Sequence, residues 1–272
     1  MGHVLLRTSA IAALLQLALI VPIAAQSMPN ATPPSASVPD LSTAIDDLVA
    51  ANRILVDQGV LDGFGHVSMR HPQNPNRYLM SRSLAPALVT PGDILEFDFD
   101  SNAFDQKGRT LFLERFIHGE IYKARPDVMS IVHSHAPSVI PFTVSQVPMK
   151  AMFHNAAFLA PGVPVFEIRK HAGMTNMLVG DGNLGKALAA TLGDKAVVLM
   201  RGHGYVATAQ SVPLSVFRAI YTEVNARLQQ SAISLGGPYT ALELEEGVRA
   251  DKVNEVISLR PWELWRKKAL AK

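Results

Sequence analysis

The sequence from residue 41 to residue 272 alternates longer amphipathic segments with short strand-like runs, and no linker divides it. Apolar residues recur at helical spacing over 41–58, 111–124, 184–192 and 213–235. The runs between them are short and apolar and are separated by Pro, Gly or Asn, which is typical of strands: 66–71, 77–83, 94–100, 128–135, 164–168, 196–200 and 205–208. This pattern predicts one domain over 41–272, with a central sheet flanked by helices.

The first 25 residues differ from the rest and predict a secretory signal peptide. A short region with one positive charge, Arg7, precedes an almost wholly apolar run that ends in Ala24-Ala25. Residues 26–40 are rich in Pro, Ser and Ala and predict an extended linker. We expect a periplasmic or secreted protein that is not stably anchored in a membrane after cleavage. An uncleaved membrane anchor is the alternative, because the apolar run is close to the shortest length that spans a bilayer.

The overall composition narrows the class of function. The chain has 25 Lys and Arg against 23 Asp and Glu, so its formal net charge is only +2. No basic block interleaved with aromatic residues occurs, so we expect no nucleic-acid partner. The sequence contains no cysteine, which excludes disulfides, thiolate metal sites and cysteine nucleophiles.

The strongest chemical signal is a pair of histidines at the end of a buried strand. His133 and His135 are two positions apart, and side chains in a strand alternate between faces, so both imidazoles point to the same side. Neutral imidazoles are preferred ligands of zinc, and two on one face can share one ion. The alternative is a pair of hydrogen-bonded histidines at a strand end.

Two further residues strengthen the prediction of a metal site. His203 follows the strand 196–200 and has a glycine on each side, which allows a sharp turn and a close approach to a ligand. Glu114 precedes His118 by four positions on the helix predicted over 111–124, so the two would share one face. A carboxylate beside a metal is either a further ligand or a group that moves protons. Glu120 lies on another face and is expected to be solvated.

These segments in this order resemble the class II aldolase/adducin family. The resemblance rests on Glu114 to His118, Arg125-Pro126-Asp127, His133-Ser134-His135 and Gly202-His203-Gly204, and it extends from about residue 41 to about residue 230. Residues 61–70 resemble the family's Gly-Asn-x-Ser-x-Arg element, in which Ser68 is the serine. The resemblance implies an α/β fold of three layers, α/β/α, with a central mixed or antiparallel sheet.

The resemblance also implies a cofactor, an assembly and a kind of chemistry. It implies one divalent metal per chain, usually Zn²⁺ but with Mn²⁺ or another ion as alternatives, bound by His133, His135 and His203 with Glu114 as the catalytic carboxylate. Family members include sugar-phosphate aldolases, an epimerase and decarboxylases of hydroxylated aromatic acids. They are commonly homotetramers. The adducin branch has lost the metal residues, which are all present here.

The sequence departs from the family where aldolases bind the substrate's phosphate. His66 stands at the asparagine position, and the second phosphate element reads Ser81-Arg82-Ser83, without its glycine. Arg82 offers a planar fork suited to a carboxylate. We therefore expect a substrate without phosphate, contacted by His66, Ser68, Ser81, Arg82 and Ser83.

The predicted function is that of a metal-dependent carbon–carbon lyase. It would cleave or decarboxylate a small hydroxy or oxo acid, aromatic acids included, through a metal-stabilised enediolate. Glu114 would handle the proton, and Tyr205, beside His203, and His66 are candidate donors to a second substrate oxygen. An epimerase or isomerase using the same enediolate is one alternative. A non-catalytic binding protein is another, and metal content would distinguish it.

Overall fold

The computed structural model describes Met1 and residues 40–271, and a seven-stranded sheet forms its centre. The strands are β1 (His66–Arg70), β2 (Arg77–Ser81), β3 (Ile94–Asp98), β4 (Ser130–Ser134), β5 (Val165–Phe166), β6 (Val197–Met200) and β7 (Gly204–Ala209). Their order in the sheet is β3-β2-β1-β4-β7-β6-β5. Neighbouring strands are antiparallel except β5 and β6, which are parallel, so the expected mixed sheet is confirmed.

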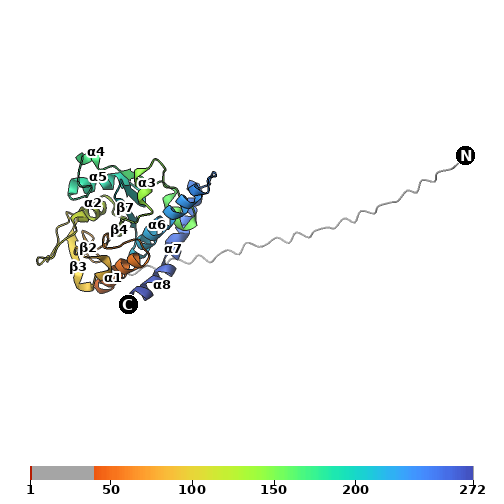
Figure 1. Cartoon of the computed structure of the whole chain (residues 1–272). Helices are drawn as coiled ribbons and strands as arrows, with labels where there is room; N and C mark the ends of the chain where they lie inside the picture. Colours follow the sequence, from red (N-terminus) through yellow and green to blue (C-terminus); the bar gives the residue numbers. More distant parts are fainter. Residues whose placement is uncertain (2–39, 272) are drawn as a thin grey trace. The chain divides into compact units, whose positions relative to one another are not determined.

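Helices cover both faces of the sheet, which confirms the expected three layers (Figure 1). On one face, α1 (Leu41–Asp57), α6 (Val212–Ser234) and α8 (Leu259–Leu270) share a core with Val67, Leu79 and Val132. On the other, α2 (Phe116–Ala124) and α5 (Gly182–Leu192) pack on Tyr78 and Val206. The remaining helices are α3 (Ile140–Val144), α4 (Arg169–Ala172) and α7 (Leu244–Ile257).

The first described helix begins where the sequence predicts. The Asp40 carboxylate accepts a hydrogen bond from the backbone N–H of Thr43 at 2.9 Å, which satisfies a donor that the first turn of α1 leaves free. The predicted signal peptide, 1–25, and the predicted linker, 26–40, lie outside the described residues apart from Met1 and Asp40. Among the residues that the structure describes, no helix is long and apolar enough to cross a membrane.

The helix predicted over 111–124 is shorter than expected. It begins only at Phe116, after a 3₁₀ turn over Leu113–Arg115 in which Glu114 has φ −90° and ψ 17°. Glu114 and His118 therefore do not share the face of one continuous helix. The kink turns the Glu114 carboxylate toward the histidines at the end of β4, and His118 projects from α2 toward β1.

Candidate metal centre and substrate pocket

Four side chains from separate parts of the chain converge at the end of β4. They are Glu114, His133, His135 and His203, and one ligand atom from each lies within 4.8 Å of all the others. The Nε2 atom of His135 lies 2.9 Å from Nε2 of His133 and 2.9 Å from Nε2 of His203. Oε2 of Glu114 lies 3.5 Å from Nε2 of His133 and 3.2 Å from Nε2 of His203. The structure thus brings together the four residues that the sequence singles out.

Backbone carbonyls fix which nitrogen of two imidazoles carries the proton. Nδ1 of His133 donates to the carbonyl of Tyr205 at 3.0 Å, and Nδ1 of His203 donates to the carbonyl of Met177 at 3.0 Å. A carbonyl can only accept, so each neutral ring presents a bare Nε2 lone pair to the centre. Two lone pairs and a carboxylate that face one another repel unless a cation lies between them. The four residues therefore fit a divalent cation that prefers nitrogen and oxygen ligands.

The electrostatics of the cluster favour positive charge. Burial alone would raise the pKa of the Glu114 carboxyl, but in the absence of a metal the neighbouring imidazoles of His133 and His203 hold it far below its usual range. Burial works to lower the pKa of His203, yet the Glu114 carboxylate beside it raises this pKa above the ordinary value. The pKa of His135 falls to about 4, because of its burial and the neighbouring imidazoles. Without a metal, Glu114 therefore stays ionised and attracts a proton to His203.

The glycines around His203 permit this convergence. Gly202 has φ +63°, in the left-handed region that a side chain disfavours. A Cβ at position 204 would clash with the carbonyl oxygen of Ser134 and would lie 3.1 Å from the His135 ring. Only glycine therefore allows the turn before β7 to approach the end of β4 so closely.

A pocket of about 460 Å³ opens beside the cluster. Four polar residues, His66, Ser83, Glu114 and His135, lie in its wall. The rest of the lining is glycine or apolar: Gly63, Phe64, Gly65, Leu84, Ala85, Phe112, Leu113 and Leu178. No lysine or arginine is among these lining residues. The pocket is therefore suited to a flat apolar body that carries a few oxygens, and it lacks the cations that usually hold a phosphate.

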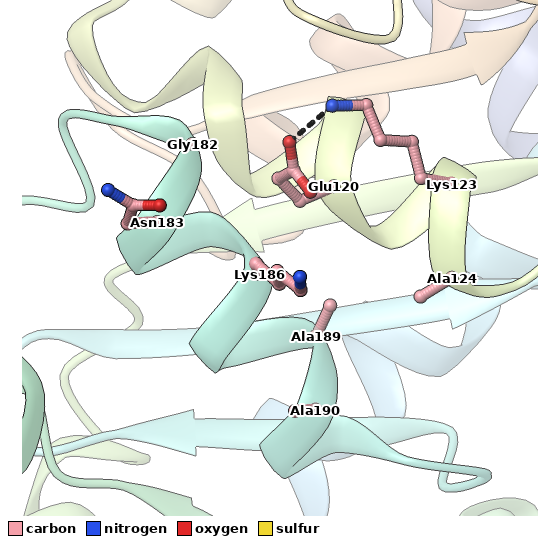
Figure 2. A pocket seen from close by; sticks show the side chains of 8 residues that line it. All are labelled: Glu120, Lys123, Ala124, Gly182, Asn183, Lys186, Ala189 and Ala190. Carbon is pink, nitrogen blue, oxygen red and sulfur yellow. Dashed lines mark hydrogen bonds and ion pairs between the residues drawn. The ribbon is translucent and has the colours of Figure 1, made fainter.

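A larger groove, of about 670 Å³, lies between α2 and α5 (Figure 2). Its carboxylate, Glu120, is paired with Lys123, and its other lining residues include Lys186 and Asn183. The histidine cluster does not line this groove. Glu120 is not solvated as expected, because its side chain is only 12% exposed and pairs with Lys123. The candidate site is the smaller pocket.

His66 belongs to a buried chain of hydrogen bonds behind the pocket. Its Nδ1 lies 2.7 Å from Nε2 of His118, and Nδ1 of His118 lies 2.6 Å from the hydroxyl oxygen of Ser68. The Ser68 hydroxyl lies in turn 2.8 Å from that of Tyr122. Ser68 is fully buried and does not line the pocket. The structure thus places His66 and Ser83 at the pocket and puts Ser68 behind it.

The other predicted substrate residues lie outside the pocket lining. Nε of Arg82 donates to Oδ1 of Asp93 at 2.7 Å, so its guanidinium supports the turn before β3. Ser81 is buried, and its hydroxyl has no hydrogen-bond partner among the described residues. The Tyr205 hydroxyl donates to the carbonyl of Ala219 at 2.7 Å, within the core on the α6 side of the sheet. The structure therefore does not bring Tyr205, Arg82 or Ser81 to the reacting groups.

Sequence reasoning missed three features of the site. The carbonyl of Met177 orients His203, and the backbone N–H of Val179 donates to Oε1 of Glu114 at 3.0 Å. Both come from the loop before α5, which carries no motif. The Phe112 ring, 4.6 Å from that of His66, forms an apolar wall. Only its place two residues before Glu114 could have indicated this.

The chain belongs to the class II aldolase/adducin family. The model of the Class II Aldolase and Adducin N-terminal domain matches residues 46–230, which is more than half of the chain. This confirms the resemblance that the histidine and glutamate motifs indicate.

Known relatives point to decarboxylases, and solved structures share the fold. The chain is 34% identical to decarboxylase tropJ of Talaromyces stipitatus, over 82% of this chain and 93% of that protein. It is 27% identical to the 3,4-dihydroxyphthalate decarboxylase of Rhodococcus jostii, over 84% of this chain and 95% of that protein. The L-fuculose 1-phosphate aldolase of Glaciozyma antarctica superposes with a TM-score of 0.69 at 20% identity, over 84% and 88%. The relatives support a lyase or decarboxylase activity, and the last likeness shows the fold alone.

Proposed function

We propose that the protein is a metal-dependent decarboxylase of a hydroxylated aromatic acid. The observation that carries the proposal is the pocket, where a Glu114 and three-histidine cluster meets apolar walls that include Phe64 and Phe112. Aromatic faces stack on a flat ring, and the cluster supplies a place for adjacent oxygens. Two of the relatives are named as decarboxylases, one of them of a dihydroxylated aromatic acid.

The lining of the pocket favours this substrate over a sugar phosphate. A phosphate dianion is usually held by arginine, lysine or a cradle of backbone N–H groups. The pocket lining has neither cation, and Arg82 is engaged by Asp93. An aromatic carboxylate in an apolar pocket loses little favourable interaction when it departs as neutral CO₂.

His133, His135 and His203 would hold the metal, with Glu114 beside it. Three imidazoles with a carboxylate suit Zn²⁺, our proposed ion, and Mn²⁺ is the alternative. When bound, the metal would supply Lewis-acid stabilisation to a substrate oxygen that becomes negatively charged.

Glu114 would move the proton. Its carboxylate takes the proton of a phenolic hydroxyl as the substrate binds, which leaves an electron-rich ring. The same carboxyl then gives this proton to the ring carbon that bears the carboxylate. The bond from that carbon to the carboxylate breaks, its electron pair returns to the ring, and CO₂ leaves. The phenolate regains one proton from solvent on release, so the balance is one carboxylate and one proton consumed for one CO₂ formed.

We also propose that the enzyme is exported and that it forms a homotetramer. The leader over residues 1–25 supports export, and the family supports the assembly. Amino-terminal sequencing of protein from the native host should find a start near Gln26. An intact Met1 on cytosolic protein would contradict export.

The tetramer is tested by light scattering. The purified protein should have a mass about four times that of one chain, and a monomer would contradict the assembly.

The test is a panel of acids with and without metal. Purified protein loaded with Zn²⁺ is incubated with dihydroxybenzoates, a hydroxylated phthalate, a 2-hydroxy acid and a sugar phosphate, and CO₂ and aldehyde are both measured. We expect CO₂ from a hydroxylated aromatic acid, its loss in chelator and its return with metal. Aldehyde from the sugar phosphate, or configurational exchange without cleavage, would contradict the proposal and favour an aldolase or an epimerase.

A further inference from the structure

The hydrogen-bond chain behind the pocket begins at the Tyr122 hydroxyl, which has one hydrogen-bond partner among the described residues. Tyr122 is 1% exposed, and within the described part of the chain its hydroxyl contacts only the Ser68 hydroxyl. A buried O–H that does not donate loses the full worth of its hydrogen bond with water. The Tyr122 hydroxyl therefore donates to Ser68.

The direction of this first hydrogen bond fixes the direction of the next ones, up to His66. Because Ser68 accepts from Tyr122, its own hydrogen is directed to its second partner, Nδ1 of His118. His118 is fully buried, and no carboxylate among the described residues is hydrogen-bonded to it, so it is neutral and carries its proton on Nε2. That Nε2–H donates to Nδ1 of His66, so the one proton of a neutral His66 is on Nε2.

The result of this order matters because His66 lines the pocket. Its Nδ1 is used by His118, and its Nε2 has no hydrogen-bond partner among the described residues. Of the four polar residues in the lining, Glu114 and His135 belong to the metal cluster. His66 and Ser83 are left to contact the polar part of a substrate, and no cation accompanies them.

We propose that Tyr122, Ser68 and His118 are positioning residues that hold His66 as the Nε2–H tautomer, so that it donates a hydrogen bond to the substrate's carboxylate. The part that concerns the carboxylate rests on the proposed function. A neutral donor orients the carboxylate without stabilising its charge as strongly as an arginine would. The group thus remains able to leave as CO₂, and acids are preferred to uncharged phenols.

The first experiment needs no substrate and tests the tautomer alone. The zinc-loaded protein is labelled with ¹⁵N-histidine, and the His66 signals are assigned by their loss in His66→Gln. We expect a protonated Nε2 and an unprotonated Nδ1 on His66. The opposite tautomer, or a fast mixture of the two, would overturn the proposal whatever the enzyme's reaction is.

The second experiment reverses the direction of the hydrogen bond between residue 118 and His66, with a pair of variants of similar shape. In His118→Gln, the side-chain amide can still donate to Nδ1 of His66. In His118→Glu, an ionised carboxylate can only accept, so the single proton of a neutral His66 moves to Nδ1. The ¹⁵N signals of this variant, recorded at a pH where His66 stays neutral, verify the change before binding is measured. We expect His118→Glu to weaken binding of a dihydroxybenzoate by about 10- to 100-fold, the worth of one hydrogen bond to a charged group. Binding of catechol, which has no carboxylate, should change by less than about threefold, and KM should change more than kcat.

Two controls separate this effect from a general disturbance. The negative charge of His118→Glu could repel the acid directly, so the variant is also made in the His66→Ala background. There it should weaken binding no further, and a persisting loss would overturn the proposal. Tyr78→Phe removes another buried hydroxyl from the same aromatic cluster. This hydroxyl contacts Ser101 and the carbonyl of Arg115 and is not a member of the hydrogen-bond chain. It should leave the tautomer and the binding unchanged.

If His118→Glu does not fold, the labelled wild type and Ser68→Ala still decide. Ser68→Ala cuts the chain and should allow both tautomers of His66, and Ser68→Thr, which keeps the hydroxyl, should restore one. A single Nε2–H tautomer in both Ser68 variants would show that the chain does not set it. If no acid is decarboxylated but the tautomers behave as predicted, the proposed function is wrong, and the proposal that the hydrogen-bond chain sets the His66 tautomer still holds.

Discussion

Replacing the Glu114 carboxylate by an amide tests the proton transfer directly. Glu114→Gln keeps the size of the side chain, and its carbonyl oxygen can still accept from the N–H of Val179, as Oε1 of Glu114 does at 3.0 Å. It removes the negative charge that lies 3.2 Å from Nε2 of His203. An amide can neither take the phenolic proton nor return it to the ring carbon.

The expected loss follows from the worth of one positioned acid–base group. Turnover should fall by about 10²–10⁴-fold, which is about 3–5 kcal/mol of activation free energy. The assay is CO₂ release at saturating metal, with metal content measured on the same samples. Glu120→Gln is the matched control, because this carboxylate on α2 is paired with Lys123 in the groove away from the cluster (Figure 2). It should keep turnover within about twofold.

Two results would refute the reasoning about Glu114. Turnover within about tenfold of wild type, at full metal occupancy, would show that Glu114 moves no essential proton. If turnover and metal content fell together and excess metal restored both, Glu114 would be a ligand only.

The other predictions follow from the same contacts. His203→Ala should lose most bound metal and remain folded, as measured by elemental analysis and circular dichroism, and full metal content would contradict the site. Metal affinity should fall as the pH is lowered through the raised pKa of His203, by up to about tenfold per pH unit, because a proton and the metal compete for Nε2. The buried His118 has a pKa of about 3 and the unfolded chain's histidines titrate near 6.5, so the unfolded state binds more protons between these values. The free energy of unfolding in chelator, measured by urea unfolding, should therefore decrease as the pH falls below about 6.5, by about 1.4 kcal/mol per pH unit for this group. In His118→Gln, the free energy of unfolding should depend less steeply on pH. Arg82→Ala breaks a partly exposed ion pair with Asp93, so it should lower the free energy of unfolding by less than about 1 kcal/mol and leave KM within about twofold. A large rise in KM would show that Arg82 contacts the substrate.

The convergence of the residues of the candidate metal centre could be predicted because their signals are local. Alternation along β4, continued to the residue just after its end, places His133 and His135 on one side. The glycines flanking His203 indicate a close approach before any partner is known. Tyr205 could not be excluded in this way. Only the pairing with Ser134 across β4 and β7, which the structure gives, places its side chain on the face opposite to that of His133.

The residues that orient these groups could not be predicted in the same way. The carbonyl of Met177 and the N–H of Val179 lie on a loop whose course depends on packing between distant elements. The partners of His118 also come from a distant strand, β1, so its spacing from Glu114 indicated a shared helix face that the kink removes. A serine and an arginine in sequence likewise do not reveal that Ser81 faces the core and that Arg82 pairs with Asp93.

The decarboxylase proposal rests on one metal held by His133, His135 and His203, with the Glu114 carboxylate beside it to move the proton. It is tested most directly by titrating chelator-stripped protein with Zn²⁺ and following CO₂ release from the hydroxylated aromatic acid that the panel identifies. We predict no release without metal, a linear rise in rate, and a break at one equivalent per chain. Release of CO₂ at full rate from stripped protein, or a metal-loaded protein that releases none from any acid of the panel, would contradict the claim.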